Sequence, residues 1–257
     1  TPGLLEVVLA NSLMSHDLGA RTGTIHVEGS IQVAGYPPLT VSSRFAGGQA
    51  GLPVAFHAAR HAAGLVAVLQ TSPFGAEMDL AVDLAFRLEP EVRLLRLEEV
   101  RAHREDVRPG DVVQVSAFLR DAATGVMSEE IFEVPIPRLP RGTRLELQVG
   151  DAPSLAAADG AILMAGITRA RSARGLLQAL SRLRSSDGLY LRLARPARGV
   201  TVGADALPDL PPSVAAVIEG GASNLSMASL NHSVITEQER RLPGVVAGSG
   251  RLFLTLQ

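Results

Sequence analysis

Alternating apolar and polar residues in the middle of the chain constrain the fold most strongly. Apolar side chains occupy every second position at Leu80, Val82, Leu84 and Phe86, with small or charged residues between them. Successive side chains of a β-strand point to opposite faces, so this pattern predicts a half-buried strand with one face toward water.

Four further strands are expected after it, separated by short turns. They are residues 92–103, 112–120, 131–136 and 145–149. Prolines at 135 and 137 indicate that the strand at 131–136 lies at a sheet edge, because proline cannot donate to a ladder. Five strands with sequential pairing predict an antiparallel β-sandwich-like (Ig-like) module.

The expected domain organisation has three consecutive regions. Residues 1–75 hold a helix, a β-hairpin and an alanine-rich helix, and residues 76–151 form the antiparallel β-sandwich-like module. Residues 152–257 form a mixed helical and strand segment, either separate or packed on the same core. The fold class is therefore α+β, with flanking helices and additional strands around an Ig-like module.

The two flanking regions carry recognisable local signals. In the first, they predict a helix at 4–14, a hairpin of strands 24–33 and 39–45, and a helix at 50–70 that has proline in its first turn. In the last, they predict helices at 153–163 and 172–184, with Ser172 as N-cap. They also predict a strand at 189–193, a loop at 196–212, a short helix through 218, a weakly patterned stretch at 220–242 and a closing strand at 251–257.

Composition excludes several kinds of chemistry. The chain has no cysteine and no lysine, so disulfides, thiol catalysis, Schiff-base chemistry and a P-loop lysine are excluded. All 24 basic residues are arginine, which is typical of a GC-rich genome. A net charge of -2 with 4% aromatic residues predicts no nucleic-acid partner. No apolar run reaches the roughly 20 residues of an integral membrane segment.

One histidine pair has metal-ligand spacing. His57 and His61 stand four residues apart on the expected helix, where two imidazoles could share zinc. The intervening residues lack the glutamate of a metalloprotease helix, and no third ligand is evident. We therefore predict a surface or packing pair, with no metal and no cofactor.

No nucleophile has a supporting sequence motif. Ser249 sits between two glycines but lacks the surrounding Gly-x-Ser-x-Gly elbow, and His232 lies between polar neighbours. Asn224 and Asn231 match the N-glycosylation pattern, which we interpret as chance in a chain of bacterial composition. No catalytic residue is predicted.

Carboxylate pairs are expected to be solvated. Asp79 and Asp83 lie on the polar face of one strand. The adjacent pairs Glu98–Glu99 and Glu129–Glu130 are each expected to point to opposite faces of a strand.

Several longer stretches carry a resemblance to a known family. They are Thr24-Ile25-His26-Val27-Glu28-Gly29-Ser30-Ile31 with Gly35-Tyr36-Pro37-Pro38; Val107-Arg108-Pro109-Gly110-Asp111-Val112-Val113; Val134-Pro135-Ile136-Pro137 through Leu147-Gln148-Val149-Gly150-Asp151; and Leu189-Tyr190-Leu191-Arg192-Leu193 with Leu207-Pro208-Asp209-Leu210-Pro211-Pro212-Ser213-Val214. In these stretches the chain resembles the region that follows the peptidase domain in bacterial, acidobacteria-like proteins with a SpoIVB-type (S55 family) serine peptidase domain.

The resemblance implies an extracytoplasmic, non-catalytic C-terminal region. The family's Gly-x-Ser-Gly-Ser-Pro nucleophile segment is absent from this chain, so no catalytic residue carries over. The chain starts at Thr1-Pro2-Gly3, which we interpret as the start of a processed or excised piece.

These observations lead to an expected function and to alternatives. We expect a structural or interaction module that binds protein partners, either an upstream peptidase-like region or other subunits, including copies of itself. Strands 131–136 and 251–257 are the candidate contact edges. One alternative is part of a serine endopeptidase whose catalytic segment lies elsewhere. Another is an anionic ligand-binding module that uses the arginines at 169, 171, 174, 182, 184, 192, 195 and 198.

Overall fold

The computed structural model describes residues 2–16, 22–47, 52–168, 170–202, 205–209, 211, 214 and 227–257. The chain forms two compact units, each assembled from separated segments. Unit 1 contains Thr1–Leu94, Ala170–Asp187 and Leu242–Val245; unit 2 contains Leu95–Arg169, Gly188–Arg241 and Val246–Gln257. The three consecutive regions expected from the sequence stay a prediction.

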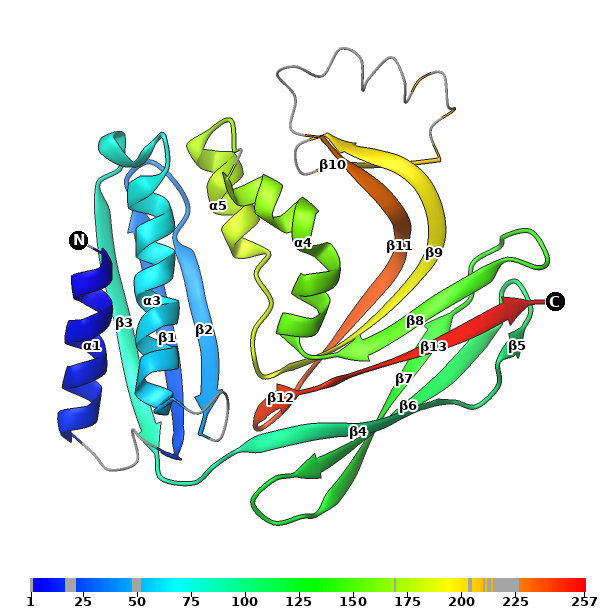
Figure 1. The fold of residues 1–257 in the computed structure, drawn as a ribbon, viewed down its shortest axis with the longest axis horizontal. Coiled ribbons are helices and arrows are strands. Elements are labelled where there is room, and N and C mark those ends of the chain that lie inside the picture. The colour runs from blue at the N-terminus through cyan, green and yellow to red at the C-terminus, as the bar shows by residue number, and fades with distance from the viewer. Residues whose placement is uncertain are drawn as a thin grey trace. The chain divides into compact units, whose positions relative to one another are not determined.

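The fold class is α+β, as expected, with three sheets (Figure 1). In unit 1, strands β1 (Thr24–Val33), β2 (Leu39–Ala46) and β3 (Leu80–Glu89) form an antiparallel sheet of order β2-β1-β3. Helix α3 (Val54–Thr71) packs on this sheet, and α1 (Pro2–His16) packs on α3. The buried face of α3 is largely alanine, which lets a helix approach a sheet closely.

Helix α5 (Ala173–Ser181) completes unit 1 beside β2. Ser172 is its N-cap, as predicted, because its side chain accepts a hydrogen bond from the backbone N–H of Gly175 at 3.1 Å. Leu176, Leu177 and Leu180 are buried on one face of this helix, whereas Leu183, beyond its end, is exposed. A short 3-10 turn, η1 (Gly75–Glu77), precedes β3.

Unit 2 contains most of the remaining strands. One sheet has the order β10-β9-β8-β13-β5, and β11 also pairs with β9, so that the long strands curl (Figure 1). Its strands are β5 (Asp106–Val107), β8 (Arg144–Gly150), β9 (Gly188–Val202), β10 (Asp205–Pro208), β11 (Met227–Arg241) and β13 (Ser249–Leu256). Helix α4 (Ala152–Thr168) adjoins β9, where Leu155 and Tyr190 are buried together.

The third sheet has the order β12-β4-β6-β7. Its strands are β4 (Leu94–Ala102), β6 (Val112–Asp121), β7 (Met127–Pro135) and β12 (Val245–Ala247). Every second residue of β6 from Val113 to Leu119 is buried, and so are Phe132 and Val134 of β7. None of the described helices is both long and apolar enough to cross a membrane.

The five predicted strands of the middle third exist, but the predicted sequential pairing is wrong at both ends. β3 pairs with β1 instead of β4, and β7 and β8 belong to different sheets. The pairing of β3 with β1 is especially close at Gly29 of β1. A Cβ at Gly29 would lie 2.1 Å from the carbonyl oxygen of Asp83, so glycine allows β3 its position.

The predicted loop at 196–212 and the weakly patterned stretch at 220–242 are largely strand. β9 and β11 pair along almost their whole length. Pro196 lies opposite His232 beside a register shift, which accommodates a residue that has no N–H. Residues 212–213, 215–218 and 220–226 of the expected helix and stretch lie outside the described residues.

The two predicted edge strands have different outcomes. Among the described strands, β7 pairs with β6 alone, which confirms the edge position inferred from its prolines. The edge prediction for 251–257 is wrong at Thr255 and Leu256, where β13 pairs with β5 on the side opposite β8. The two-residue strand β5 was too short to be recognised from its alternation.

Replacement of Gly29 by alanine tests the close approach of β1 and β3. We expect Gly29→Ala to lower the free energy of unfolding by roughly 2–4 kcal/mol, because the methyl group meets Asp83 and the φ angle of Gly29 is 145°. Gly35→Ala is the matched control: Gly35 also has positive φ, but nothing lies within 4 Å of an added Cβ. Urea denaturation that gave equal losses for both variants would contradict the close approach.

Candidate functional site

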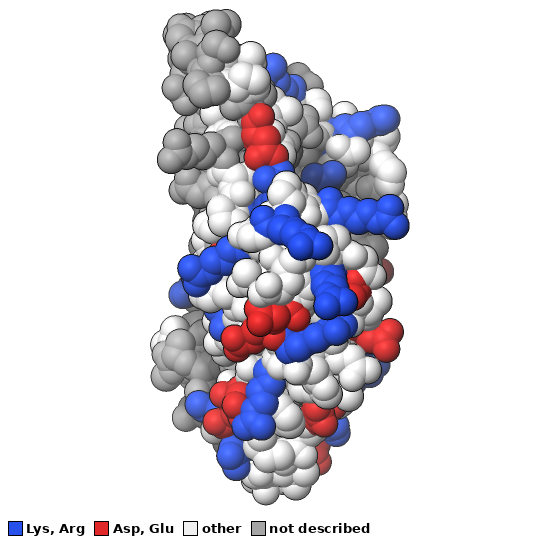
Figure 2. Space-filling view, turned by 90° about the vertical axis from the view of Figure 1, so that its right-hand side faces the viewer, with Lys and Arg blue, Asp and Glu red and all other residues white. Residues whose placement is uncertain are grey.

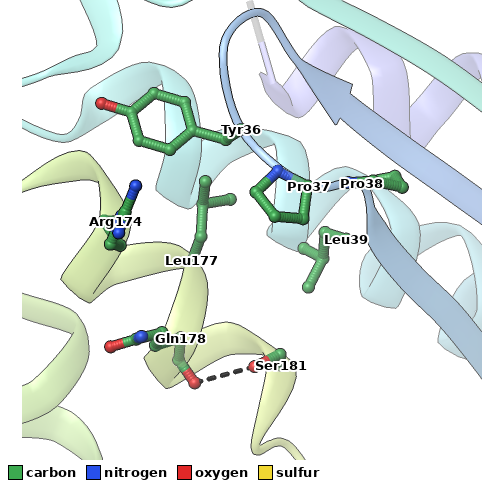
Figure 3. A pocket seen from close by; sticks show the side chains of 8 residues that line it. All are labelled: Tyr36, Pro37, Pro38, Leu39, Arg174, Leu177, Gln178 and Ser181. Carbon is green, nitrogen blue, oxygen red and sulfur yellow. Dashed lines mark hydrogen bonds between the residues drawn. The ribbon is translucent and has the colours of Figure 1, made fainter.

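A pocket in unit 1 lies between the start of β2 and helix α5 (Figure 3). Its volume is about 290 Å³. The lining residues are Tyr36, Pro37, Pro38, Leu39, Arg174, Leu177, Gln178 and Ser181. They come from two segments more than a hundred residues apart in the sequence, so only the tertiary fold creates the pocket.

The walls of the pocket are mostly apolar and conformationally restricted. Leu39 and Leu177 are buried, with 5% and 7% of their surface exposed, and two consecutive prolines form the adjoining wall. The proline rings fix φ, and the backbone N–H of Tyr36 donates to the carbonyl of Val33 at 3.0 Å. The turn is therefore held in place before any ligand arrives.

The lining has few polar groups, and the charged side chain among its described residues is the cation Arg174. Arg174 is exposed in the first turn of α5, and no ion pair is recorded for it among the described residues. The hydroxyl of Ser181 donates to the carbonyl of Gln178 at 3.0 Å, within the helix (Figure 3). In that view Tyr36 and Arg174 lie at one end of the pocket and Ser181 at the other. No described lining residue is a carboxylate, so the pocket favours an apolar group that carries negative charge.

Hydrogen bonds to the edge of β2 hold α5 in position. The hydroxyl of Ser186 accepts from the backbone N–H of Arg44 at 2.9 Å and donates to the carbonyl of the same residue. The hydroxyl of Ser185 lies 3.0 Å from the carbonyl oxygen of Ser42 and 2.5 Å from the carboxylate of Asp187, so these two acceptors share its single proton. The chain that leaves α5 is thereby fixed to the strand that forms the opposite wall.

A half-buried ionic network joins β1, β2 and β3 of the same sheet, away from the residues that line the pocket. The guanidinium Nε of Arg44 donates to Nδ1 of His26 at 3.1 Å, and its Nη1 donates to the carbonyl of Leu242 at 3.1 Å. Nε2 of His26 lies 3.3 Å from Glu89, without the alignment of a hydrogen bond. Burial and the neighbouring Arg44 charge lower the pKa of His26 from 6.5.

The two histidines of helix α3, His57 and His61, have different surroundings. Nε2 of His61 lies 3.2 Å from the hydroxyl of Ser43, and its ring packs on Phe45 with centroids 5.4 Å apart. Burial lowers the pKa of His61 from 6.5. Nε2 of His57 is buried without a hydrogen-bond partner among the described residues. No group of three metal-ligating side chains gathers in the described part of the chain, so nothing completes a zinc site around the pair.

A second hollow, in unit 2, contains a histidine that sequence reasoning did not pair. Nε2 of His232 lies 3.2 Å from the carboxylate of Glu146, and Arg251 lies 3.7 Å from the same carboxylate. The hollow has a volume of about 190 Å³. Its described lining carries no hydroxyl beside the imidazole, so the pair has the orientation of a base with its partner but no nucleophile.

Ser249, Asp79 and Asp83 do not line either of the two cavities described above. Ser249 is exposed on β13, opposite Gly150, and lies next to Gly248, whose φ is 107°. Asp83 is exposed on β3, and the backbone carbonyl of Asp79 accepts from the N–H of Ala34 at 3.1 Å. Asn224 and the side chain of Asn231 lie outside the described residues.

The glutamate pairs differ from each other. Glu129 and Glu130 are opposite Phe118 and Ala117, so they point to opposite faces as predicted. The prediction is wrong for Glu98 and Glu99, because the β-bulge between Leu97 and Glu99 interrupts the alternation. They bind Arg120 at 3.1 Å and Arg101 at 2.6 Å, on the same face of the sheet.

The arginines at 169–198 do not form one uniform set. Those at 171, 174 and 182 are exposed in unit 1, whereas Arg192 is buried in unit 2 between Asp159 and Glu237, and Arg195 pairs with Asp209. Residue 169 and the side chain of Arg198 lie outside the described residues. On the face drawn in Figure 2, basic and acidic side chains lie next to one another mainly in the lower half of the view. The pairing in unit 2 leaves Arg192 and Arg195 neutralised.

Sequence reasoning did not identify the pocket. The Tyr-Pro-Pro segment lies in the predicted hairpin of strands 24–33 and 39–45, and the leucines of α5 lie in the predicted helix at 172–184. The missing information was their contact across more than 130 residues of chain, which no local pattern contains. No family model, curated protein or solved structure matches this chain.

The two histidines with lowered pKa predict a pH-dependent stability. Their unfolded forms bind protons near pH 6.5 and their folded forms only below it, so the unfolded state binds more protons as the pH falls through this window. The free energy of unfolding should therefore fall between pH 7.5 and pH 5.5. His61→Gln should reduce this dependence, and the exposed His103→Gln should not. Urea unfolding at the two pH values measures both; an unchanged slope in His61→Gln would count against the assignment.

Proposed function

We propose that this chain is a protein-binding module in which the unit 1 pocket receives an apolar side chain of a partner, with a carboxylate of that partner at Arg174. The observation that carries the proposal is an apolar cavity whose described walls include one cation and no anion. Its volume, about 290 Å³, is at the lower end of the range for ligand sites and suits a side chain better than a large cofactor.

Arginine suits the proposed role at the mouth of the pocket. Its planar guanidinium can donate two parallel hydrogen bonds to a carboxylate and keeps its charge at every physiological pH. Because Arg174 is exposed, its contribution to binding is modest, and most of the affinity comes from burying the apolar group against Leu39 and Leu177.

The wider setting of this module rests on the sequence resemblance alone. We propose a non-catalytic interaction region of an extracytoplasmic bacterial protein of the SpoIVB peptidase S55 type, with a peptidase-like region or assembly subunits as partners. Part of a serine endopeptidase is the alternative, and the Glu146–His232 pair is the observation that favours it. The anionic ligand-binding alternative is supported only by the exposed arginines of unit 1.

A reduced form of the sandwich-like architecture is also proposed, for unit 2 alone. A Cβ at Gly250 of β13 would lie 2.7 Å from the side chain of Val100 of β4. The side chain of Gln238 in β11 donates to the backbone carbonyl of Glu133 in β7 at 2.7 Å. These two contacts support face-to-face packing of the two sheets, with buried residues between them.

Small apolar acids test the pocket directly. We expect 3-phenylpropionate to bind more tightly than its neutral amide. We expect Arg174→Ala to lower the affinity for the acid by about 2- to 5-fold, as for an exposed ion pair. Arg171→Ala is the matched control, because Arg171 is exposed next to α5 and does not line the pocket. Ligand titration followed by NMR shifts of the Leu39 and Leu177 methyl groups measures both.

Equal affinity for acid and amide, or equal loss in the two arginine variants, would contradict the role of Arg174. Shifts confined to residues outside the pocket would contradict the site itself.

A further inference from the structure

We infer that the partner binds as an added β-strand on the outer edge of β2, beside α5, with its apolar side chain in the pocket and its carboxylate at Arg174. This inference rests on the proposed function and names the form of the partner: an extended, acidic peptide segment. It follows from the backbone groups that β2 leaves unpaired next to the pocket.

β2 is an edge strand of its sheet. The order is β2-β1-β3, and the antiparallel register of β2 with β1 runs without interruption from Leu39 to Ala46. In such a pair, alternate residues direct both backbone groups at the neighbouring strand, and the residues between them direct both groups away.

Hydrogen bonds from the chain after α5 show which residues face outward. The backbone N–H and carbonyl of Arg44 both bind the Ser186 hydroxyl, so these two backbone groups point away from β1. By alternation, the backbone groups of Ser42 and Thr40 also point away from β1. Ser185 occupies the carbonyl of Ser42. No hydrogen bond is recorded, among the described residues, for the N–H of Ser42 or for either backbone group of Thr40.

This open stretch of edge lies next to the pocket. Thr40 follows Leu39, which lines the cavity, and Thr40 and Ser42 are both exposed residues. An unpaired edge recruits an additional strand, and pockets for alternate side chains then supply specificity. The hydrogen bonds of Ser185 to Ser42 and of Ser186 to Arg44 occupy the end of the β2 edge that is farther from the pocket. The added strand therefore pairs only over a short segment.

The side-chain pattern of the added strand follows from that of β2. Leu39 and Val41 are buried on one face, and Thr40 and Ser42 are exposed on the other. Neighbouring residues of paired strands share a face. The residue of the partner beside Leu39 is therefore apolar and enters the pocket, whereas its two neighbours are polar.

Charge complementarity favours an acidic partner. Neither the turn at 34–38, nor β2, nor α5 contains an acidic residue, and α5 is flanked by Arg171 and Arg182 in addition to Arg174. The carboxylate that meets Arg174 can come from a chain terminus or from an aspartate or glutamate side chain. Both sources provide the same recognition chemistry.

Selection from random octapeptides, displayed once with a free C-terminus and once followed by a linker, supplies the probes. Enriched peptides are synthesised with a free or an amidated terminus, and their affinity is measured by fluorescence anisotropy. We expect alternating apolar and polar positions with at least one acid. Loss of binding on amidation identifies a terminal carboxylate, and retained binding of acidic peptides identifies a side-chain carboxylate.

Thr40→Pro tests the strand addition. Proline removes an N–H that points away from β1, so the ladder with β1 stays intact. We expect its Kd to rise about fivefold or more relative to Thr40→Val, which keeps the N–H. Hydrogen exchange of the Thr40 and Ser42 amides in the wild-type chain is the second measurement, and binding should slow both. It decides alone if Thr40→Pro fails to fold by circular dichroism.

The outcomes separate the two proposals. If Thr40→Pro binds like Thr40→Val and neither amide is protected, while Arg174→Ala still weakens binding, the strand addition is overturned and the pocket stands. If no peptide is enriched over a chain with the pocket filled by Gln178→Trp, the proposed function fails as well.

Discussion

The side chain of Arg44 links the separated segments from which unit 1 is built. It binds His26 on the neighbouring strand and the carbonyl of Leu242, while its backbone binds Ser186 after α5. A guanidinium can satisfy several acceptors at once, which a lysine could not do in the same geometry. Because these contacts connect residues 142 and 198 positions apart, α5 has a defined place beside β2.

The candidate pocket is a consequence of that arrangement. The serines that attach α5 to β2 occupy only one end of the strand edge and leave the other end open where the prolines begin. The same edge is thus protected from indiscriminate pairing over part of its length and available over a short remainder. A rigid turn, a buried leucine pair and one exposed cation then border the available part.

The second unit shows why buried charge need not indicate chemistry. Arg192 is almost fully buried, yet Asp159 and Glu237 neutralise it, as expected for a buried charge that is stable only when it is paired. The Glu146–His232 pair has catalytic residue types but no nucleophile in its described surroundings. Residue types alone would therefore suggest a catalytic activity that the described surroundings in this sheet do not support.

The sequence by itself determined the helices of the described residues, the hairpin, most strands of the middle third, the Ser172 cap and the edge position of β7, because each depends on local periodicity or on one residue's backbone chemistry. It did not determine the pairing of β3, the long strands β9 and β11, or the pocket. Sheet order, curvature and the meeting of Leu39 with Leu177 depend on contacts between residues distant in the chain, whose free energy no local pattern records.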